Sequence, residues 1–191
     1  MIRTLDDTRD TIIETAMRLY TTRGYFGTSM RDIAAEAGLS TGAIYHHFPA
    51  KEAIAKESFR RTIQFLVGEL SGALDSAPDG RGRVYAIIAT LMRLAEEHRV
   101  IMEYALYIKH REIIPDGKPI CSSEPFELLK SFMTYEMKRG SIRNQDIYIA
   151  TVCLTAMPIR FMQLRWDGVI ETPLADLVEP IFECVWRALA P

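Results

Sequence analysis

Apolar residues recur along almost the whole chain at intervals of three and four residues, and no stretch alternates apolar and polar residues for long. Such spacing lines up apolar side chains on one face of a helix, whereas a strand needs a period of two. The sequence therefore predicts an all-α fold. With 191 residues, the chain has room for a small N-terminal lobe and a larger helical body, which we place at residues 1–50 and 51–191.

Glycine, proline and capping residues divide this pattern into separate helices. Gly24 and Gly38 favour the left-handed turns that end helices, and Pro49 breaks the chain before a long helix. Thr172 and Pro173 are a favoured cap and first residue for the last helix. The expected helices cover residues 7–23, 30–37, 41–48, 51–74, 83–98, 100–110, 124–139, 144–166 and 173–189.

Prolines also fall inside the last two expected helices, at Pro158 and Pro180. Each should kink its helix, because proline lacks a backbone N–H and clashes with the preceding turn. The apolar run Ile147–Ile159 is shorter than the roughly 20 residues that span a bilayer. It predicts a buried helix and no membrane partner.

The N-terminus and the cysteines both indicate a cytoplasmic protein. The first ten residues lack the apolar segment of a signal peptide. Cys121, Cys153 and Cys184 are far apart and form no C-x-x-C pair, so we expect free thiols, no metal site and no cofactor. Cys121 lies in a polar stretch where a reactive thiol is conceivable, although an inert one is the better interpretation.

The net charge of −2 gives the chain no overall attraction for nucleic acid, so DNA binding must depend on local geometry. Residues 29–48 offer that geometry. Ser29 is placed to cap one short helix with Asp32 as its capping-box partner, and Gly38 turns the chain into a second short helix capped by Ser40. Two short helices joined by a glycine turn are typical of a helix-turn-helix.

The second of these helices is suited to a DNA groove at its N-terminus. Free backbone N–H groups and a positive dipole end attract phosphate. Ser40 and Thr41 can bond base edges or phosphates, and Gly42 allows close approach of the backbone. The larger polar residues that follow can reach flanking phosphates; they are Tyr45, His46, His47 and Lys51.

The adjacent histidines also raise the possibility of metal or general-base chemistry. Zinc pairs on a helix favour positions i and i+4, and neither His46 nor His47 has that partner. The chain has no G-x-x-x-x-G-K, H-E-x-x-H or G-x-S-x-G motif either. We therefore predict no catalytic residues and no enzyme activity.

As a set, these residues resemble the N-terminal signature of TetR-family transcriptional regulators. The matching residues are Gly24-Tyr25, Thr28-Ser29, Met30 to Ala34, Ala37 to Ser40, Gly42, Ile44-Tyr45, His47-Phe48 and Lys51-Glu52. The resemblance implies an all-helical homodimer with a DNA-binding lobe and a ligand-binding body. It places Arg31, Ser40, Thr41 and Gly42 at bases, and Thr28, Ser29, Tyr45, His46, His47 and Lys51 at phosphates.

The helices of the body carry large, adaptable side chains that we interpret as either core or the wall of a cavity. The candidate ligand-binding residues are Met92, Glu103, Tyr104, Tyr107, His110, Phe132, Met133, Phe161, Met162 and Trp166. Among them, Glu103, Tyr107 and His110 have spacing that puts them on one helix face. They would be polar anchors in a cavity or a stripe facing solvent, and the second is slightly favoured.

The last two helices have a near-heptad apolar row, which fits packing within one chain or a dimer interface. The resemblance favours a four-helix interface between two copies. Its candidate residues are Ile147, Ala150, Leu154, Leu174, Leu177, Val178, Ile181 and Val185.

Together these features predict a repressor that binds double-stranded DNA at a palindromic operator as a homodimer. A small, largely apolar molecule of unknown identity would release it. Two alternatives stay open: a DNA-binding regulator that responds to a protein partner or acts architecturally, and a small helical enzyme that happens to carry a helix-turn-helix.

Overall fold

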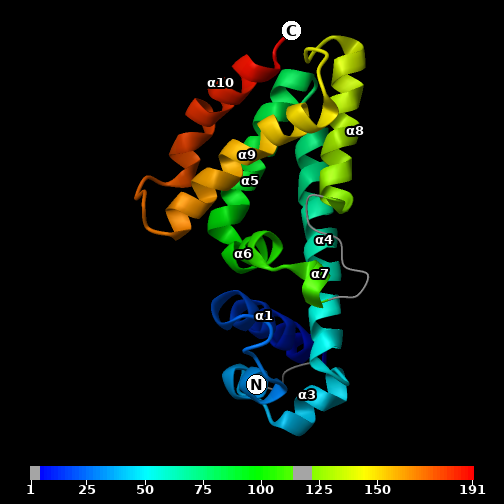
Figure 1. Cartoon of the computed structure of the whole chain (residues 1–191), viewed down its shortest axis with the longest axis vertical. Coiled ribbons are helices and arrows are strands. Elements are labelled where there is room, and N and C mark those ends of the chain that lie inside the picture. Colours follow the sequence, from blue (N-terminus) through cyan, green and yellow to red (C-terminus); the bar gives the residue numbers. More distant parts are fainter. Residues whose placement is uncertain (1–4, 114–121) are drawn as a thin grey trace. The chain divides into compact units, whose positions relative to one another are not determined.

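The computed structural model describes residues 5–113 and 122–191, and these residues form helices and no strand. The prediction of an all-α fold is confirmed. The helices, labelled in Figure 1 where there is room, are α1 (Leu5–Arg23), α2 (Met30–Ala37), α3 (Thr41–His47), α4 (Lys51–Asp75), α5 (Gly80–Glu97), α6 (Arg99–Tyr107), α7 (His110–Ile113), α8 (Glu124–Arg139), α9 (Ile147–Trp166), the 3-10 helix η2 (Leu174–Leu177) and α10 (Val178–Leu189).

The chain divides into two compact units, and the division falls inside α4. Unit 1 consists of residues 1–64 and 100–121, and unit 2 consists of residues 65–99 and 122–191. Each unit is described by itself. The functional boundary expected after residue 50 is a different kind of division, and it stays a prediction.

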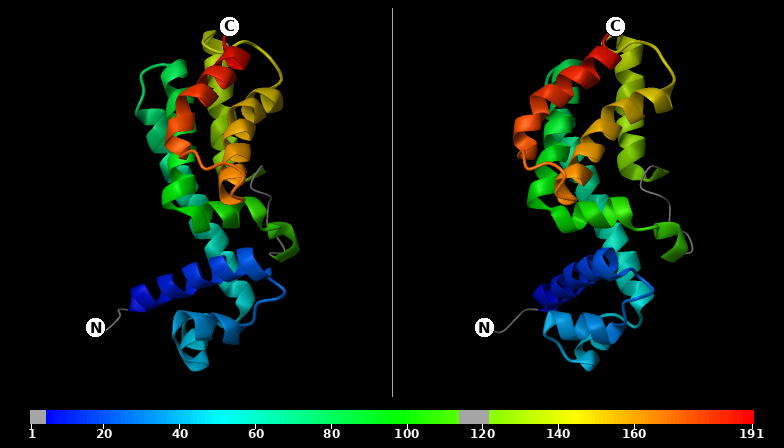
Figure 2. Two further views of the ribbon diagram at one scale, coloured as in Figure 1. Left: turned by 90° about the vertical axis from the view of Figure 1, so that its left-hand side faces the viewer. Right: turned by 60° about the vertical axis from the view of Figure 1, so that its left-hand side comes forward.

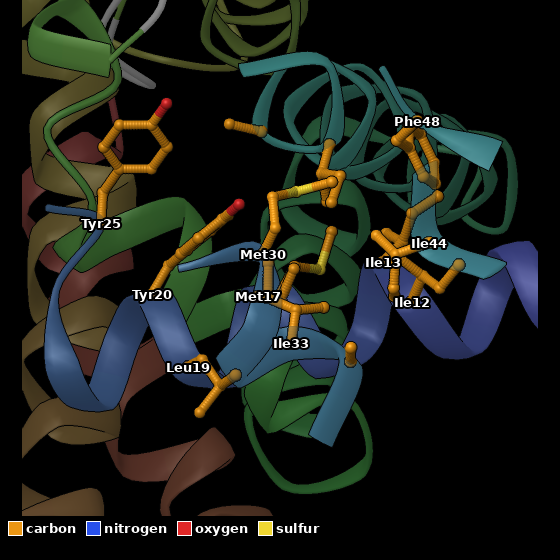
Figure 3. Packing of buried hydrophobic residues seen from close by; sticks show 14 of the residues in the cluster. Ile12, Ile13, Met17, Leu19, Tyr20, Tyr25, Met30, Ile33, Ile44 and Phe48 are labelled. Carbon is orange, nitrogen blue, oxygen red and sulfur yellow. The ribbon is translucent and has the colours of Figure 1, made fainter. Parts of the chain in front are cut away.

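Helices α1, α2 and α3 pack through a shared apolar core in unit 1. Ile12, Ile33 and Ile44, one from each helix, are fully buried there, and Figure 3 shows their side chains gathered between the three ribbons. Gly38 ends α2 with a φ of 66°, a left-handed conformation that suits glycine. The three-helix lobe, α1 to α3, is therefore built as its sequence predicts.

Helix α5 lies at the centre of unit 2 and packs against α9, α10 and η2, while α8 packs against α9 (Figure 2). An ion pair ties α5 to α8: the Arg83 guanidinium donates to Glu136 over 2.9 Å, and the Glu136 carboxylate is almost fully buried. Gly80 lies so close that a Cβ there would stand 2.7 Å from Glu136 Oε2. A larger residue at the start of α5 would therefore force the Glu136 carboxylate to shift.

Several predicted helix boundaries were wrong, and local capping explains one of them. Helix α5 begins before Arg83 because Asp79 accepts a hydrogen bond from the backbone N–H of Gly82 at 2.7 Å. The stretch expected to run to His110 instead ends at Tyr107, and His110 begins the separate helix α7. Glu103, Tyr107 and His110 therefore do not share one helix face.

The last helix also differs from the prediction. Pro173 precedes a 3-10 turn, Leu174–Leu177, and α10 begins only at Val178. Pro180 consequently falls in the first turn of α10, where a missing N–H breaks no helical hydrogen bond. The expected kink at this proline was wrong. Pro158, in contrast, does lie inside α9.

Helix α9 is less buried than its apolar sequence predicts. By length and composition alone it could cross a membrane, but only 33% of its most apolar window is buried in the structure. Ile149 is 61% exposed and Val152 is 48% exposed. The expectation of a buried helix is corrected: one face of α9 packs inside unit 2, and the opposite face presents apolar side chains outward.

Candidate functional site

The N-terminus of α3 presents a polar, uncharged tip. Ser40 caps it, and its Oγ accepts a hydrogen bond from the backbone N–H of Ala43 at 3.1 Å. Gly42 is exposed, and the nearest atom to a Cβ built there is Ser40 Oγ at 3.9 Å. No packing among the described residues therefore requires glycine at this position, and its small size leaves the tip free for close approach by another molecule.

Further along α3, the side chains sort by burial. Ile44 is buried in the lobe, Tyr45 is 53% exposed, His46 is exposed and His47 is half-buried. The two imidazole rings meet edge to face, with centroids 5.4 Å apart. Tyr45 and His46 thus remain available to an external partner, while Ile44 anchors the helix.

Ser29 and Arg31 lie at the start of α2. The Ser29 N–H and hydroxyl both donate to Asp32 Oδ2, at 2.7 and 2.6 Å, and Ser29 Oγ accepts from the Asp32 N–H. These bonds hold the pKa of Asp32 below its usual range. Arg31 is exposed, and within the part of the chain that the structure describes no ion pair holds its guanidinium. The capping box is confirmed.

Thr28 and Lys51 point inward, in contrast to the other expected DNA contacts. Thr28 is buried, and its hydroxyl donates to the carbonyl oxygen of Gly24 at 2.9 Å. Lys51 Nζ donates to the carbonyl oxygens of Tyr25 and Thr28, at 2.8 and 2.7 Å, and lies 4.2 Å from the centre of the Tyr25 ring. In this structure both residues hold the loop between α1 and α2 rather than face a phosphate.

The expected ligand-binding residues are not brought together as one group. Glu103, Tyr104, Tyr107 and His110 belong to unit 1, and the other six belong to unit 2. Tyr104 and His110 are buried, whereas Tyr107 is exposed. In unit 2, Met92, Met133 and Met162 are fully buried in the core, Phe132 is also buried, and Phe161 and Trp166 are half-buried.

A groove of about 370 Å³ opens in unit 2, and Phe132 is the one expected ligand-binding residue among its lining. Arg83 and Tyr135 also line it. The Arg83 guanidinium is already bonded to the Leu74 and Ala77 carbonyls and to Glu136. The Arg83 side chain therefore stabilises the fold through these hydrogen bonds.

The expected dimer residues mostly lie inside unit 2. Ile147 and Leu177 are half-buried, and the other six are at most 8% exposed within a single chain. Side chains that are already buried have little area left to cover with a partner. The near-heptad row packs between α5, α9 and α10 within one chain, and its assignment to a dimer interface stays a prediction.

Two exposed apolar features were missed from the sequence. Ile149 and Val152 lie on the outward face of α9, and Phe26, in the loop after α1, is 78% exposed. The signal for α9 was present in its composition, because apolar residues surround the helix. Cys153 is half-buried, Cys184 is exposed, and Cys121 lies outside the described residues.

Comparisons with known proteins agree with this geometry. The sequence profile for "Bacterial regulatory proteins, tetR family" matches residues 12–57, which span α1 to α3 and the start of α4. The HTH-type transcriptional repressor KstR2 of Rhodococcus jostii is 31% identical over 163 residues, covering 83% of this chain and 78% of that protein.

Solved structures show the same fold. A TetR-family transcription regulator from Marinobacter aquaeolei superposes with a TM-score of 0.83 at 21% identity, covering 97% of this chain and 96% of that one. The regulator FadR from Bacillus subtilis, in complex with stearoyl-CoA, gives 0.73 at 18% identity over 92% and 96%. These relatives are transcription regulators rather than enzymes.

Proposed function

Because this chain belongs to the tetR family of bacterial regulatory proteins, we propose that it is a repressor that binds a palindromic operator as a homodimer and is released by a small molecule. The observation that carries the proposal is the tip of α3. Ser40, Gly42 and Tyr45 are exposed there without a packing reason inside the lobe. The major groove of DNA explains this exposure. It accommodates a helix whose backbone can approach closely and whose uncharged side chains can hydrogen-bond to base edges.

The contacts divide by role. Ser40, Thr41, Gly42 and Arg31 are proposed at base edges, and Ser29, Tyr45, His46 and His47 at phosphates. Thr28 and Lys51 are assigned to holding the loop from residue 25 to 28, because their polar atoms are already bonded to it. Arg31 is the strongest candidate for specificity, since an unpaired guanidinium can bond guanine in two places.

A dimer is required because two recognition helices must enter grooves roughly 34 to 36 Å apart. The outward face of α9 supplies a surface for it. Ile149, Val152 and Ala156 follow one another at intervals of three and four residues, and all three are exposed. Such a stripe buries itself against the same stripe on a second copy, as symmetric interfaces do.

The proposed effector is a small, largely apolar molecule in the cytoplasm. A regulator of the same fold, FadR, is solved with stearoyl-CoA, a ligand with a long apolar chain. Release requires that the effector bind the DNA-free arrangement more tightly than the DNA-bound one.

The test uses the purified chain and a library of genomic fragments, from which bound DNA is selected and sequenced. We expect one inverted-repeat site to be enriched, and its affinity to fall steeply with salt because phosphate contacts release counterions. A scrambled fragment of equal length is the control. Equal binding to the selected and scrambled fragments at every salt concentration would overturn the proposal.

A further inference from the structure

Besides Tyr25 Oη, three buried side chains in unit 1 have polar atoms that make no hydrogen bond within the described residues. Ser58 Oγ, Thr62 Oγ1 and His110 Nδ1 make no hydrogen bond, and each residue is at most 2% exposed. Buried polar groups are nearly always bonded, because an unmade hydrogen bond in the interior is unfavourable. An unused set of three therefore needs an explanation beyond folding.

Helical spacing places Ser58 and Thr62 on one face of α4, and His110 packs on Phe59 of the same helix. Ala55, Ser58, Phe59 and Thr62 are at positions i, i+3, i+4 and i+7 of α4, so they share one face. The chain of α6 and α7 packs on that face: the Tyr104 hydroxyl donates to the Ala55 carbonyl at 3.1 Å, and the ring centroids of His110 and Phe59 are 4.5 Å apart. We call Ser58, Thr62 and His110 the α4 polar cluster.

The hydrogen-bonding character of His110 is fixed by its other nitrogen. Nε2 lies 3.1 Å from the Tyr104 carbonyl oxygen, which can only accept, so Nε2 carries the proton. Burial among aromatic rings lowers the pKa of His110 to about 4. The ring is therefore neutral at physiological pH, and Nδ1 is an acceptor that lacks a donor.

The chemistry of the cluster defines what it would bind. It offers one acceptor at His110 and two hydroxyls, at Ser58 and Thr62, that can donate or accept. The face of α4 from residue 55 to 62 carries no charged residue at these positions, and its neighbours Phe59 and Tyr104 are aromatic. A charged group would be costly here, whereas a neutral hydroxyl on an apolar body satisfies both the acceptor and the hydroxyls.

We propose that the α4 polar cluster binds a neutral hydroxyl group of the effector, which is thus an apolar molecule bearing an uncharged O–H. The inference rests on the proposed function, because it names the chemical class of the effector. Serine and threonine hydroxyls in a helix often hydrogen-bond to the carbonyl four residues earlier. The Ser58 and Thr62 hydroxyls do not, so they are available to a ligand.

The test compares two pairs of compounds that differ by one hydroxyl: phenol with toluene, and 2-naphthol with 2-methylnaphthalene. Dissociation constants are measured by calorimetry on the full chain. We expect the hydroxylated member of at least one pair to bind about fivefold tighter or more, as one net hydrogen bond predicts. The double variant Ser58→Ala/Thr62→Val removes both hydroxyls and leaves the His110 acceptor, so it should weaken this preference while its melting temperature stays equal or rises.

A matched control and a spectroscopic readout complete the design. Thr134→Val removes an exposed hydroxyl of α8 that bonds to the Lys130 carbonyl, and it should keep the preference. In ¹⁵N spectra, the His110 Nδ1 signal should move when the hydroxylated probe is added and stay when its methyl partner is added.

Equal binding within both pairs, or a preference as large in the double variant as in the unmodified chain, overturns the inference. Operator binding by the unmodified chain is measured in parallel. If the operator is bound and the hydroxyl preference is absent, this inference alone fails. If no operator is bound, the proposed function fails, whatever the probes show.

Discussion

Helices α3 and α9 each present a face that their own unit leaves uncovered, and the two faces differ in chemistry. The tip of α3 is polar, with Ser40 and Tyr45 beside an open Gly42. The outward face of α9 is apolar, with Ile149 and Val152 exposed. A polar, uncharged face suits a hydrated groove, and an apolar stripe suits a dry contact with another helix. The difference in chemistry therefore indicates DNA as the partner of the α3 face and a second helix as the partner of the α9 face.

The largest effect is expected from a substitution in the apolar face of α9. Val152→Arg places a charge in the middle of the apolar stripe, where a second copy would bury it without a partner. We expect a monomer in analytical ultracentrifugation and a loss of operator affinity of about 100-fold or more, because the second half-site no longer contributes. Val169→Arg, at an exposed valine beyond the end of α9, is the control. A Val152→Arg protein that stays dimeric would show that the apolar face has another use.

The open glycine of α3 gives the next largest effect. In Gly42→Leu the new Cβ has only Ser40 Oγ within 4 Å, at 3.9 Å, so stability should hold or rise by about 0.5–1 kcal/mol, as helix propensity predicts. Operator affinity should fall about 10- to 100-fold, since the helix can no longer approach the bases. Gly68→Leu, at an equally open position of α4, should gain stability without losing affinity. Unimpaired operator binding by Gly42→Leu would contradict the groove assignment.

A variant of Lys51 can distinguish a structural role of this residue from a phosphate contact. Lys51→Met removes two ammonium hydrogen bonds to the loop carbonyls, and we expect a loss of about 2 kcal/mol in the free energy of unfolding. Operator affinity should fall severalfold with an unchanged salt dependence. A phosphate contact predicts the reverse, a stable protein whose salt slope drops by about 1. Lys56→Met, on the exposed side of α4, controls for the lost charge.

The smallest effect concerns the ion pairs that Glu57 of α4 makes with Arg60 and Arg61. Hydrogen bonds from Arg60 and then Arg61 lower the pKa of Glu57 from 4.5 to about 2. A lowered carboxyl pKa stabilises the fold above its unfolded value, and this contribution is lost as the pH falls from about 4.5 towards 2. Urea unfolding of Glu57→Gln should show a shallower loss between pH 6 and pH 3 than the unmodified chain, and Glu14→Gln should not. If the free energy of unfolding fell equally with pH in all three proteins, Glu57 would not contribute to acid sensitivity.

Local rules were enough for the lobe that carries the candidate site. The Ser29–Asp32 capping box and the left-handed Gly38 depend on bonds and backbone angles within a few residues. The bounds of α8, with glycine at its end and proline near its start, follow from the same rules. A short-range signal can be recognised in the sequence because all of its partners are neighbours along the chain.

Other contacts could not be read from the sequence because the partner is distant along the chain. Nothing near Lys51 in the chain shows that its ammonium bonds to the carbonyls of residues 25 and 28. The same holds for His110, which was expected on a face with Glu103 and lies buried against Phe59 instead. The heptad row of the last two helices matched a dimer and a monomer core equally well, because both bury the same pattern of apolar residues.

The sequence by itself determined that the chain is helical and carries a helix-turn-helix with an uncharged tip, because helical period, caps and glycine turns act over three or four residues. Tertiary structure alone decided which groups are covered: that Gly42 is open, that α9 turns Ile149 and Val152 outward, and that Ser58 Oγ, Thr62 Oγ1 and His110 Nδ1 are buried without a hydrogen bond. The reason is that exposure depends on which distant segments cover a side chain, and amphipathic spacing defines a face without naming what packs on it.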